Sequence, residues 1–201
     1  MVRRLRPADQ GDAVLVSALR AGDQAAYTEL FDRHAPTLTR VILRIIGTPA
    51  DVPELVNEAM FRAIRRIHDL EAGDCLKSWL CAIAVNVSRE HVRARTRRRW
   101  FRWIGLDDAS ELPAPAADFE HREAARELYR ILDELPVDDR IVFAMRYLDD
   151  RELTDVAQAC GVSLATVKRR LVRAEKRIAL LGRKSPSLRG WLEGGARWAS
   201  R

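Results

Sequence analysis

The chain has 201 residues, of which 47% are hydrophobic and 32% charged, a balance typical of a protein that folds around a buried core. Lys and Arg number 35 against 29 Asp and Glu, so the net charge is +6. No stretch approaches the ~20 apolar residues that a membrane span requires, and the spacing of the three cysteines fits neither a disulfide framework nor a metal site. We therefore expect a cytoplasmic protein without membrane insertion, metal or cofactor.

The charges are unevenly distributed along the chain. Two basic segments, 89–102 and 163–184, flank an acidic stretch at 107–123. This pattern indicates two contacts with a polyanion, separated by a connector that is kept away from it.

The first eleven residues form a loose basic leader, and the first predicted domain spans 12–100. Apolar residues at helical spacing predict a helix on each side of the Ala21-Gly22-Asp23 turn, which ends the first helix and caps the second. A third helix is expected over 51–69 and a fourth from Leu76 to Arg99. Pro36 falls inside the second helix, where a kink or local break is expected. The second half of the fourth helix is nearly all Arg and cannot be buried, so it requires a counter-anion such as nucleic-acid phosphate.

The second predicted domain spans 120–182 and follows a linker at 101–119. The linker contains two prolines and several acids, which is typical of an extended segment with little fixed structure. Pro136 ends the first helix of this domain, and a second helix is expected over 138–148. The tail at 183–201 is rich in glycine, and we expect it to be disordered or to be ordered by a partner.

The segment 152–181 is predicted to be a helix-turn-helix unit. Gly161 suits a left-handed turn, and Ser163 is a good N-cap for the helix that follows. That helix has one apolar stripe and is basic elsewhere, as expected of a recognition helix, although a helical hairpin with a solvated basic face is also compatible with the pattern. The expected fold is therefore all-α: two small helical domains joined by a flexible acidic linker, the second a helix-turn-helix domain.

Four stretches, in this order, resemble the motifs of extracytoplasmic-function (ECF) sigma factors, the bacterial subunits that direct RNA polymerase to promoters. The stretches are AGDQAAY at 21–27, ELVNEAMFRA at 54–63, SWLCAIAVN at 78–86, and 135–178, which begins LPVDDRIVFAMRY. Together they extend over most of 12–181.

The resemblance implies a role for the exposed face of the third helix. In the family this face docks on the coiled-coil clamp of the largest subunit of core RNA polymerase. The matching residues here are Glu54, Asn57, Glu58 and Arg62. Glu54 and Asn57 each differ by one methylene from the Asp and Gln of the family, so the contacts they make are not carried over in detail.

The resemblance also implies two contacts with promoter DNA. The loop at 68–77 and the fourth helix would open the strands and hold an extruded base, and the recognition helix would enter the major groove at the upstream element. The residues implied for the first contact are Lys77, Trp79, Asn86, Arg89, Arg93 and Arg97, with Arg95 and Arg98 also holding phosphates. Those implied for the second are Ser163, Thr166, Lys168, Arg169, Arg170 and Arg173. Most family members are held inactive by an anti-sigma factor, so such a partner is expected here.

Catalytic motifs are missing from the sequence. It contains no Gly-rich phosphate loop, no nucleophile with a base and no paired-carboxylate site, so we expect a protein that is not an enzyme. Three alternatives stay open. A free-standing DNA-binding regulator does not account for 54–63, and a recombinase requires a Ser or Tyr nucleophile within an Arg-lined domain. A degenerate sigma-like protein that does not initiate transcription is compatible with the altered third helix.

Overall fold

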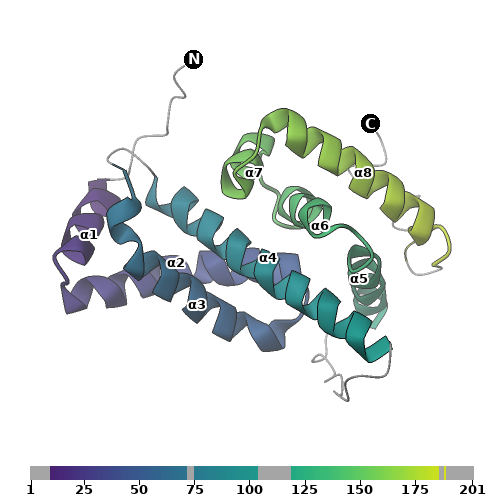
Figure 1. Ribbon diagram of the computed structural model, residues 1–201, viewed down its shortest axis with the longest axis horizontal. Coiled ribbons are helices and arrows are strands. Elements are labelled where there is room, and N and C mark those ends of the chain that lie inside the picture. Colours follow the sequence, from purple (N-terminus) through teal and green to yellow (C-terminus); the bar gives the residue numbers. More distant parts are fainter. Residues whose placement is uncertain (1–9, 72–74, 104–118, 186–187, 189–201) are drawn as a thin grey trace.

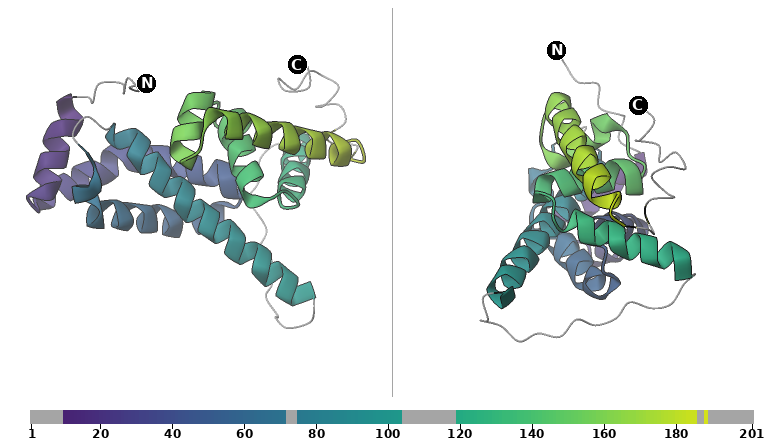
Figure 2. Two further views of the ribbon diagram at one scale, coloured as in Figure 1. Left: turned by 45° about the horizontal axis from the view of Figure 1, so that its top comes forward. Right: turned by 90° about the vertical axis from the view of Figure 1, so that its right-hand side faces the viewer.

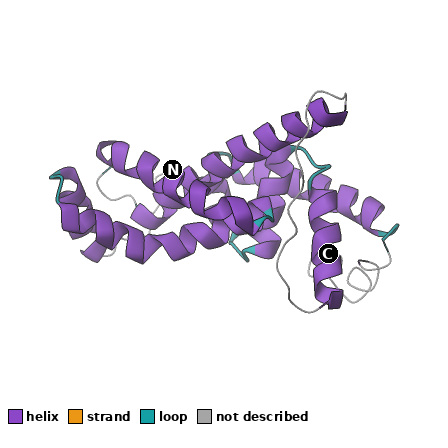
Figure 3. Cartoon of the chain, turned by 90° about the horizontal axis from the view of Figure 1, so that it is seen from below, coloured by secondary structure: helices purple, strands orange, loops and turns teal. Residues whose placement is uncertain are grey.

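The structure is a computed structural model, and it describes residues 10–71, 75–103, 119–185 and 188. Within these ranges the chain forms helices joined by short turns, with no strand (Figure 3), which confirms the all-α prediction. The predictions for most of the leader, the linker and the tail concern residues outside the described ranges.

The first domain contains two long helices and two shorter ones, α1 (Gln10–Arg20), α2 (Gln24–Ile46), α3 (Val52–Arg65) and α4 (Leu76–Trp103). Short 3-10 turns, η1 (Pro49–Asp51) and η2 (Ile67–Asp69), flank α3. Asp23 caps α2 as the turn motif predicts, because its side chain accepts a hydrogen bond from the Ala25 N–H. Of the two alternatives expected at Pro36, a break does not occur, since α2 continues through this residue, and the kink stays a prediction. The buried residues on both sides of Pro36, His34 and Leu38, hold α2 as one continuous helix.

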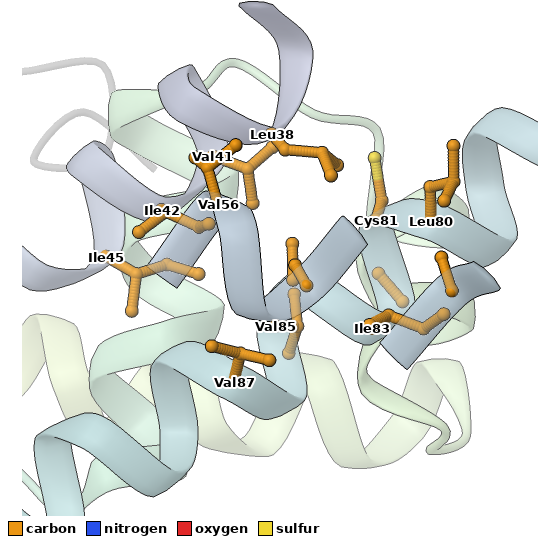
Figure 4. Close-up of a cluster of buried hydrophobic side chains, with 14 of the residues drawn as sticks. Leu38, Val41, Ile42, Ile45, Val56, Leu80, Cys81, Ile83, Val85 and Val87 are labelled. Carbon is orange, nitrogen blue, oxygen red and sulfur yellow. The ribbon is translucent and has the colours of Figure 1, made fainter. Parts of the chain in front are cut away.

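The helix α4 is the central element of this domain. Its first half packs against α2 and α3 through aliphatic side chains that meet in one cluster (Figure 4). The cluster includes Leu38, Val41, Ile42, Ile45, Val56, Leu80, Ile83, Val85 and Val87. The helix continues to Trp103, four residues beyond the predicted end, since Arg is a good helix former and nothing in the intervening sequence stops a helix.

The second domain contains α5 (Phe119–Leu132), α6 (Val137–Phe143), a π-helical turn η3 (Ala144–Leu148), α7 (Leu153–Cys160) and α8 (Leu164–Gly182). The predicted helix-turn-helix is confirmed. Gly161 ends α7 at φ 66°, and the Ser163 Oγ accepts a hydrogen bond from the Thr166 N–H at 3.2 Å. The domain core also includes Leu188, so it extends beyond the predicted limit of 182.

The two domains pack against each other. In Figures 1 and 2 the second domain lies along α4 and next to the C-terminal end of α2. Buried residues of α6, η3 and α7, including Ile141, Met145 and Val156, belong to the same apolar cluster as the core of the first domain. The linker pattern left the relative placement of the domains open, and the structure shows a closed pair.

At Gly47, the C-terminal end of α2, the two domains approach each other closely. It adopts φ 76°, and a Cβ atom there would overlap the ring of Tyr129 in α5. The Tyr129 hydroxyl donates a hydrogen bond to the Arg44 carbonyl at 3.0 Å. A side chain at 47 would therefore push the second domain away from α2.

Gly47→Ala is expected to destabilise the chain more than Gly22→Ala, which provides a matched control. Gly22 has nearly the same φ, 78°, but nothing lies within 4 Å of the point that a Cβ atom would occupy there. Both substitutions force Ala into a left-handed conformation at about 1–2 kcal/mol, and the clash at 47 adds roughly 1–3 kcal/mol. Urea unfolding followed by circular dichroism measures the difference. Equal losses for the two variants would show that Tyr129 does not press on Gly47.

Candidate nucleic-acid and polymerase interfaces

The outer face of α3 carries the residues predicted to bind polymerase. Glu54 and Asn57 are exposed, and the spacing of three and four residues places Glu54, Asn57 and Glu58 on one side of the helix. Arg62 bonds to two acids. Its Nε lies 2.6 Å from Glu58 Oε1, and its Nη1 and Nη2 lie 2.9 and 2.8 Å from the two oxygens of Glu90 on α4.

These hydrogen bonds stabilise the charged forms of Arg62 and Glu90. The hydrogen bond from Arg62 lowers the pKa of Glu90, and the bonds from Glu90 and Glu58 raise the pKa of Arg62. A two-pronged Arg–carboxylate pair also holds its geometry better than a single contact. The surface therefore presents Glu54 and Asn57 beside a fixed ion cluster.

Phe61 is a feature of this face that the sequence patterns did not single out. Its side chain is 55% exposed, and the Arg65 guanidinium carbon lies 5.4 Å from the ring centroid. Aromatic residues are enriched at protein interfaces relative to the rest of the surface. The signal was present in the sequence, since Phe61 lies outside the apolar stripe of the third helix.

The DNA candidates on α4 form one stripe. Asn86, Arg89, Arg93 and Arg97 are spaced by three, four and four residues, which aligns them along one side of the helix. Asn86, Arg93 and Arg97 are exposed, and so is Lys77 at the start of the helix. Trp79 is half-buried and packs on the core, so its ring is held mainly by the fold.

The DNA candidates on α8 fall into two groups. Lys168 and Arg169 are exposed, and Arg169 donates a hydrogen bond to Thr166 Oγ1 at 3.2 Å. Ser163 is mainly a capping residue. Arg170 and Arg173 instead bond to acids of α6. Arg170 is only 18% exposed, whereas Arg173 remains 65% exposed while it is paired.

The acids of α6 were not predicted as site residues. Asp138 Oδ1 lies 2.9 Å from Arg89 Nε, and Asp138 Oδ2 lies 3.1 Å from Arg170 Nη2. Asp139 accepts from Arg173 Nε and Nη2 at 3.0 and 2.7 Å. Both acids occupy the first turn of a helix, where Asp is common because it interacts favourably with the helix dipole. Their position in the sequence therefore did not indicate that they pair with arginines of other helices.

Arg140 is a further residue that the sequence patterns did not single out. Its side chain is 1% exposed, and it donates to the Ile45 carbonyl at 2.8 Å and the Ile46 carbonyl at 2.9 Å, at the end of α2. It also bonds to Asp133, which pairs in turn with Arg95 of α4 at 2.5 Å. Burial lowers the pKa of Arg140, and Asp133 opposes that change. Arg95 therefore contributes to the domain interface and is not free to bind phosphate as expected.

A cleft of about 630 Å³ separates the start of α4 from the turn between α7 and α8. Lys77, Ser78 and Cys81 line one side, and Arg151, Ser163 and Leu164 line the other. Arg151 Nη2 lies 3.8 Å from the Cys81 sulfur. The cleft thus brings the beginnings of the two predicted DNA-reading helices face to face.

Metal-ligating clusters and membrane-spanning helices are not found in the described ranges. No group of three or more His, Cys, Asp or Glu side chains in these ranges could hold a metal ion. None of their helices has both the length and the apolar character needed to cross a membrane.

Comparison with known families matches both domains. Residues 30–98 match the family described as Sigma-70 region 2, and residues 125–178 match Sigma-70, region 4. The two matches together span more than half of the chain, and they coincide with the α2–α4 bundle and with the second domain up to α8.

Individual proteins agree with these matches. The ECF RNA polymerase sigma-E factor of Escherichia coli K12 is 27% identical over 176 residues, which is 83% of this chain and 92% of that protein. Its Haemophilus influenzae counterpart is 25% identical over 176 residues, with 83% and 93% covered.

Two solved structures share the fold. CnrH in complex with the cytosolic domain of CnrY has a TM-score of 0.59 at 20% identity, covering 88% of this chain and 99% of that one. RpoE in complex with the anti-sigma factor NepR, from Bartonella quintana, has a TM-score of 0.55 at 21% identity, covering 77% and 95%. With regions 2 and 4 in the expected order, the chain belongs to the sigma-70 family and, within it, to the ECF sigma factors, alternative sigma factors that direct transcription initiation.

Proposed function

We propose that this chain binds core RNA polymerase through the α3 face and directs promoter-specific initiation through two DNA contacts, with strand opening by the first domain. One observation carries the proposal. A single chain of the sigma family presents an exposed basic stripe on α4 and an exposed basic recognition helix, α8, on separate domains. A regulator that binds DNA only through a helix-turn-helix would not account for the basic stripe on α4.

On α4, Asn86 is the candidate for reading a base edge, and Arg93 and Arg97 are candidates for binding the phosphates on either side of it. Amides read base edges by paired hydrogen bonds, whereas guanidinium groups on phosphates fix register and orientation. An unpaired base costs a few kcal/mol to extrude, and stacking and edge contacts with the protein offset that cost. The predicted role of Lys77 at the start of this helix belongs to the same contact.

On α8, Lys168 and Arg169 are the candidates for contacts with bases at the upstream element. They lie in the first turns of the helix, which is the part that reaches base edges when a recognition helix enters the major groove. Ser163 and Thr166 would support them by fixing the beginning of the helix. The roles of Arg170 and Arg173 depend on release from the α6 acids.

Partners of the relatives suggest a partner for this chain. RpoE of Bartonella quintana was solved with the anti-sigma factor NepR, and CnrH with the cytosolic domain of CnrY. We infer that an anti-sigma factor also controls this chain. The chain would act in the cytoplasm by binding alone, because the polymerase supplies the chemistry of RNA synthesis.

The strand-opening role is tested by permanganate probing of unpaired thymines near the start site, with holoenzyme assembled from core polymerase and the full chain. Asn86→Ala is expected to reduce promoter opening about 5- to 150-fold, because a well-placed amide–base contact contributes ~1–3 kcal/mol. Thr28→Ala, an exposed position on α2 and outside the α4 stripe, is the control and should leave opening unchanged. Full opening by the Asn86 variant would remove Asn86 from the site.

A further inference from the structure

We propose that Glu90 of α4 is a positioning residue for the polymerase contact on α3. It holds Arg62 and offsets its charge, so that Glu54 and Glu58 can bind a basic surface of core polymerase. This inference rests on the proposed function, which takes the α3 face as the polymerase contact. It adds a residue of the neighbouring helix to that contact, and it assigns Arg62 a role within the chain in place of a bond to the partner.

The charge of the α3 face is opposite to that of the whole chain. The chain has a net charge of +6, yet this face presents Glu54, which is exposed, and Glu58, whose side chain is 44% exposed. Such acids repel DNA phosphates and attract a surface that carries Lys or Arg. The α3 face therefore fits a basic protein surface, whereas the stripe on α4 fits nucleic acid.

Arg62 is the residue that could weaken this contact. It follows Glu58 by four residues, so the two side chains lie on the same side of α3, and Arg62 Nε lies 2.6 Å from Glu58 Oε1. If Glu58 were its only partner, the guanidinium would cancel the charge of that carboxylate. A lysine or arginine of the polymerase would then gain little from Glu58.

Glu90 supplies the second carboxylate that offsets Arg62. Its two oxygens accept from Arg62 Nη1 and Nη2 at 2.9 and 2.8 Å, so all three nitrogens of the guanidinium bond to acids of the same chain. Two carboxylates and one guanidinium leave the cluster with one net negative charge. Together with Glu54, the α3 face therefore stays acidic although it contains an arginine.

The position of Glu90 relative to Arg62 is set by the packing of α3 against α4. Val56 and Ala59 of α3 and Val87 of α4 are buried in the same apolar cluster, beneath the ion cluster, and Figure 4 shows Val56 and Val87 within that core. The two helices therefore hold the cluster in place before any partner arrives. A preformed contact surface loses less side-chain freedom on binding, which favours affinity.

The test measures the affinity of the full chain for core polymerase in three variants. Glu90→Gln keeps the size of the side chain and one acceptor oxygen but removes the charge, so Arg62 cancels Glu58. The double variant, Glu90→Gln with Arg62→Gln, also removes the charge of Arg62 and leaves Glu54 and Glu58 unopposed. Glu29→Gln is the control, because Glu29 also pairs with an arginine four residues on but lies on α2.

Glu90→Gln is expected to bind core polymerase about 3- to 10-fold more weakly than Glu29→Gln, and the double variant is expected to return to within about twofold of the unchanged chain. A purely structural role of the pair predicts no such recovery.

Two results would overturn the inference. One is equal affinity of Glu90→Gln and Glu29→Gln. The other is a double variant that binds no better than Glu90→Gln, since Arg62 would then contact the polymerase or stabilise the fold. Failure of the proposed function is a separate result: the unchanged chain would not bind core polymerase, and the inference would fail with it.

Discussion

Arg140→Met is expected to lower the free energy of unfolding by about 3–5 kcal/mol, the usual cost of removing one partner from a buried ion pair. The substitution keeps much of the side-chain volume but leaves Asp133 without its buried partner and the Ile45 and Ile46 carbonyls without their donor. Those carbonyls end α2, where the helix dipole places partial negative charge. Urea unfolding followed by circular dichroism provides the measurement.

Arg130→Met is the matched control for this prediction. Arg130 also pairs with an acid, Glu127, at 3.2 Å, but its side chain is 78% exposed, and such surface pairs contribute at most about 1 kcal/mol. A loss below about 1 kcal/mol for both variants would show that the α2 end is satisfied without Arg140. It would also show that the packing of the second domain against α2 does not depend on Arg140.

Arg169→Ala is expected to reduce discrimination between the preferred upstream element and a single-base variant of it by about 5- to 150-fold, which corresponds to the ~1–3 kcal/mol of a paired guanidinium–base contact. Arg169 is the exposed arginine in the early part of α8 and has no acidic partner in the hydrogen bonds of the described residues. Binding of holoenzyme to the two elements, measured side by side, gives the ratio. Affinity for core polymerase should stay unchanged, because Arg169 lies outside the α3 face.

Arg93→Ala separates base reading from phosphate binding. As an exposed residue of the α4 stripe it is proposed to contact phosphate, so its loss should weaken binding to both elements equally and reduce the salt dependence by about one charge. Equal weakening on both elements by Arg169→Ala would contradict base reading by Arg169. A selective loss by Arg93→Ala would contradict its assignment to phosphate.

Features set by neighbouring residues could be predicted from the sequence. The helix-turn-helix was predicted from an apolar stripe, the glycine at 161 and the cap at 163, and each depends on residues within a turn or two. The Asp23 cap is another local feature that was predicted correctly. At Pro36, where a kink or a local break was expected, α2 continues without a break, because tertiary packing on both sides of the helix outweighs one missing hydrogen bond. The kink stays a prediction.

Features that depend on contacts between distant segments were not predicted. Arg140 lies between two aspartates and an apolar run in α6, and nothing nearby indicates that its partners are carbonyls 94 and 95 residues away. The position of Asp138 was equally well explained by the common occurrence of Asp in the first turn of a helix. The contribution of Leu188 to the second core was concealed by the weak apolar pattern of the tail. Sequence patterns indicate which face of a helix is buried, but the structure is needed to show which residues that face contacts.

The closed pair changes how the two DNA contacts are understood. The stripe on α4 and the helix α8 belong to separate domains, yet Asp138 joins them at a single carboxylate. Arg89 and Arg170, two of the candidate DNA contacts, therefore share one acidic partner within the chain.

Run-off transcription tests the central claim most directly. Core RNA polymerase is supplied with the full chain and with DNA fragments from the genome that encodes it, and transcripts are mapped at their 5′ ends. We expect defined start sites that appear only when the chain is present and that weaken with Arg169→Ala. Absence of chain-dependent start sites on every fragment, despite binding of the chain to core polymerase, would contradict a role in promoter-specific initiation.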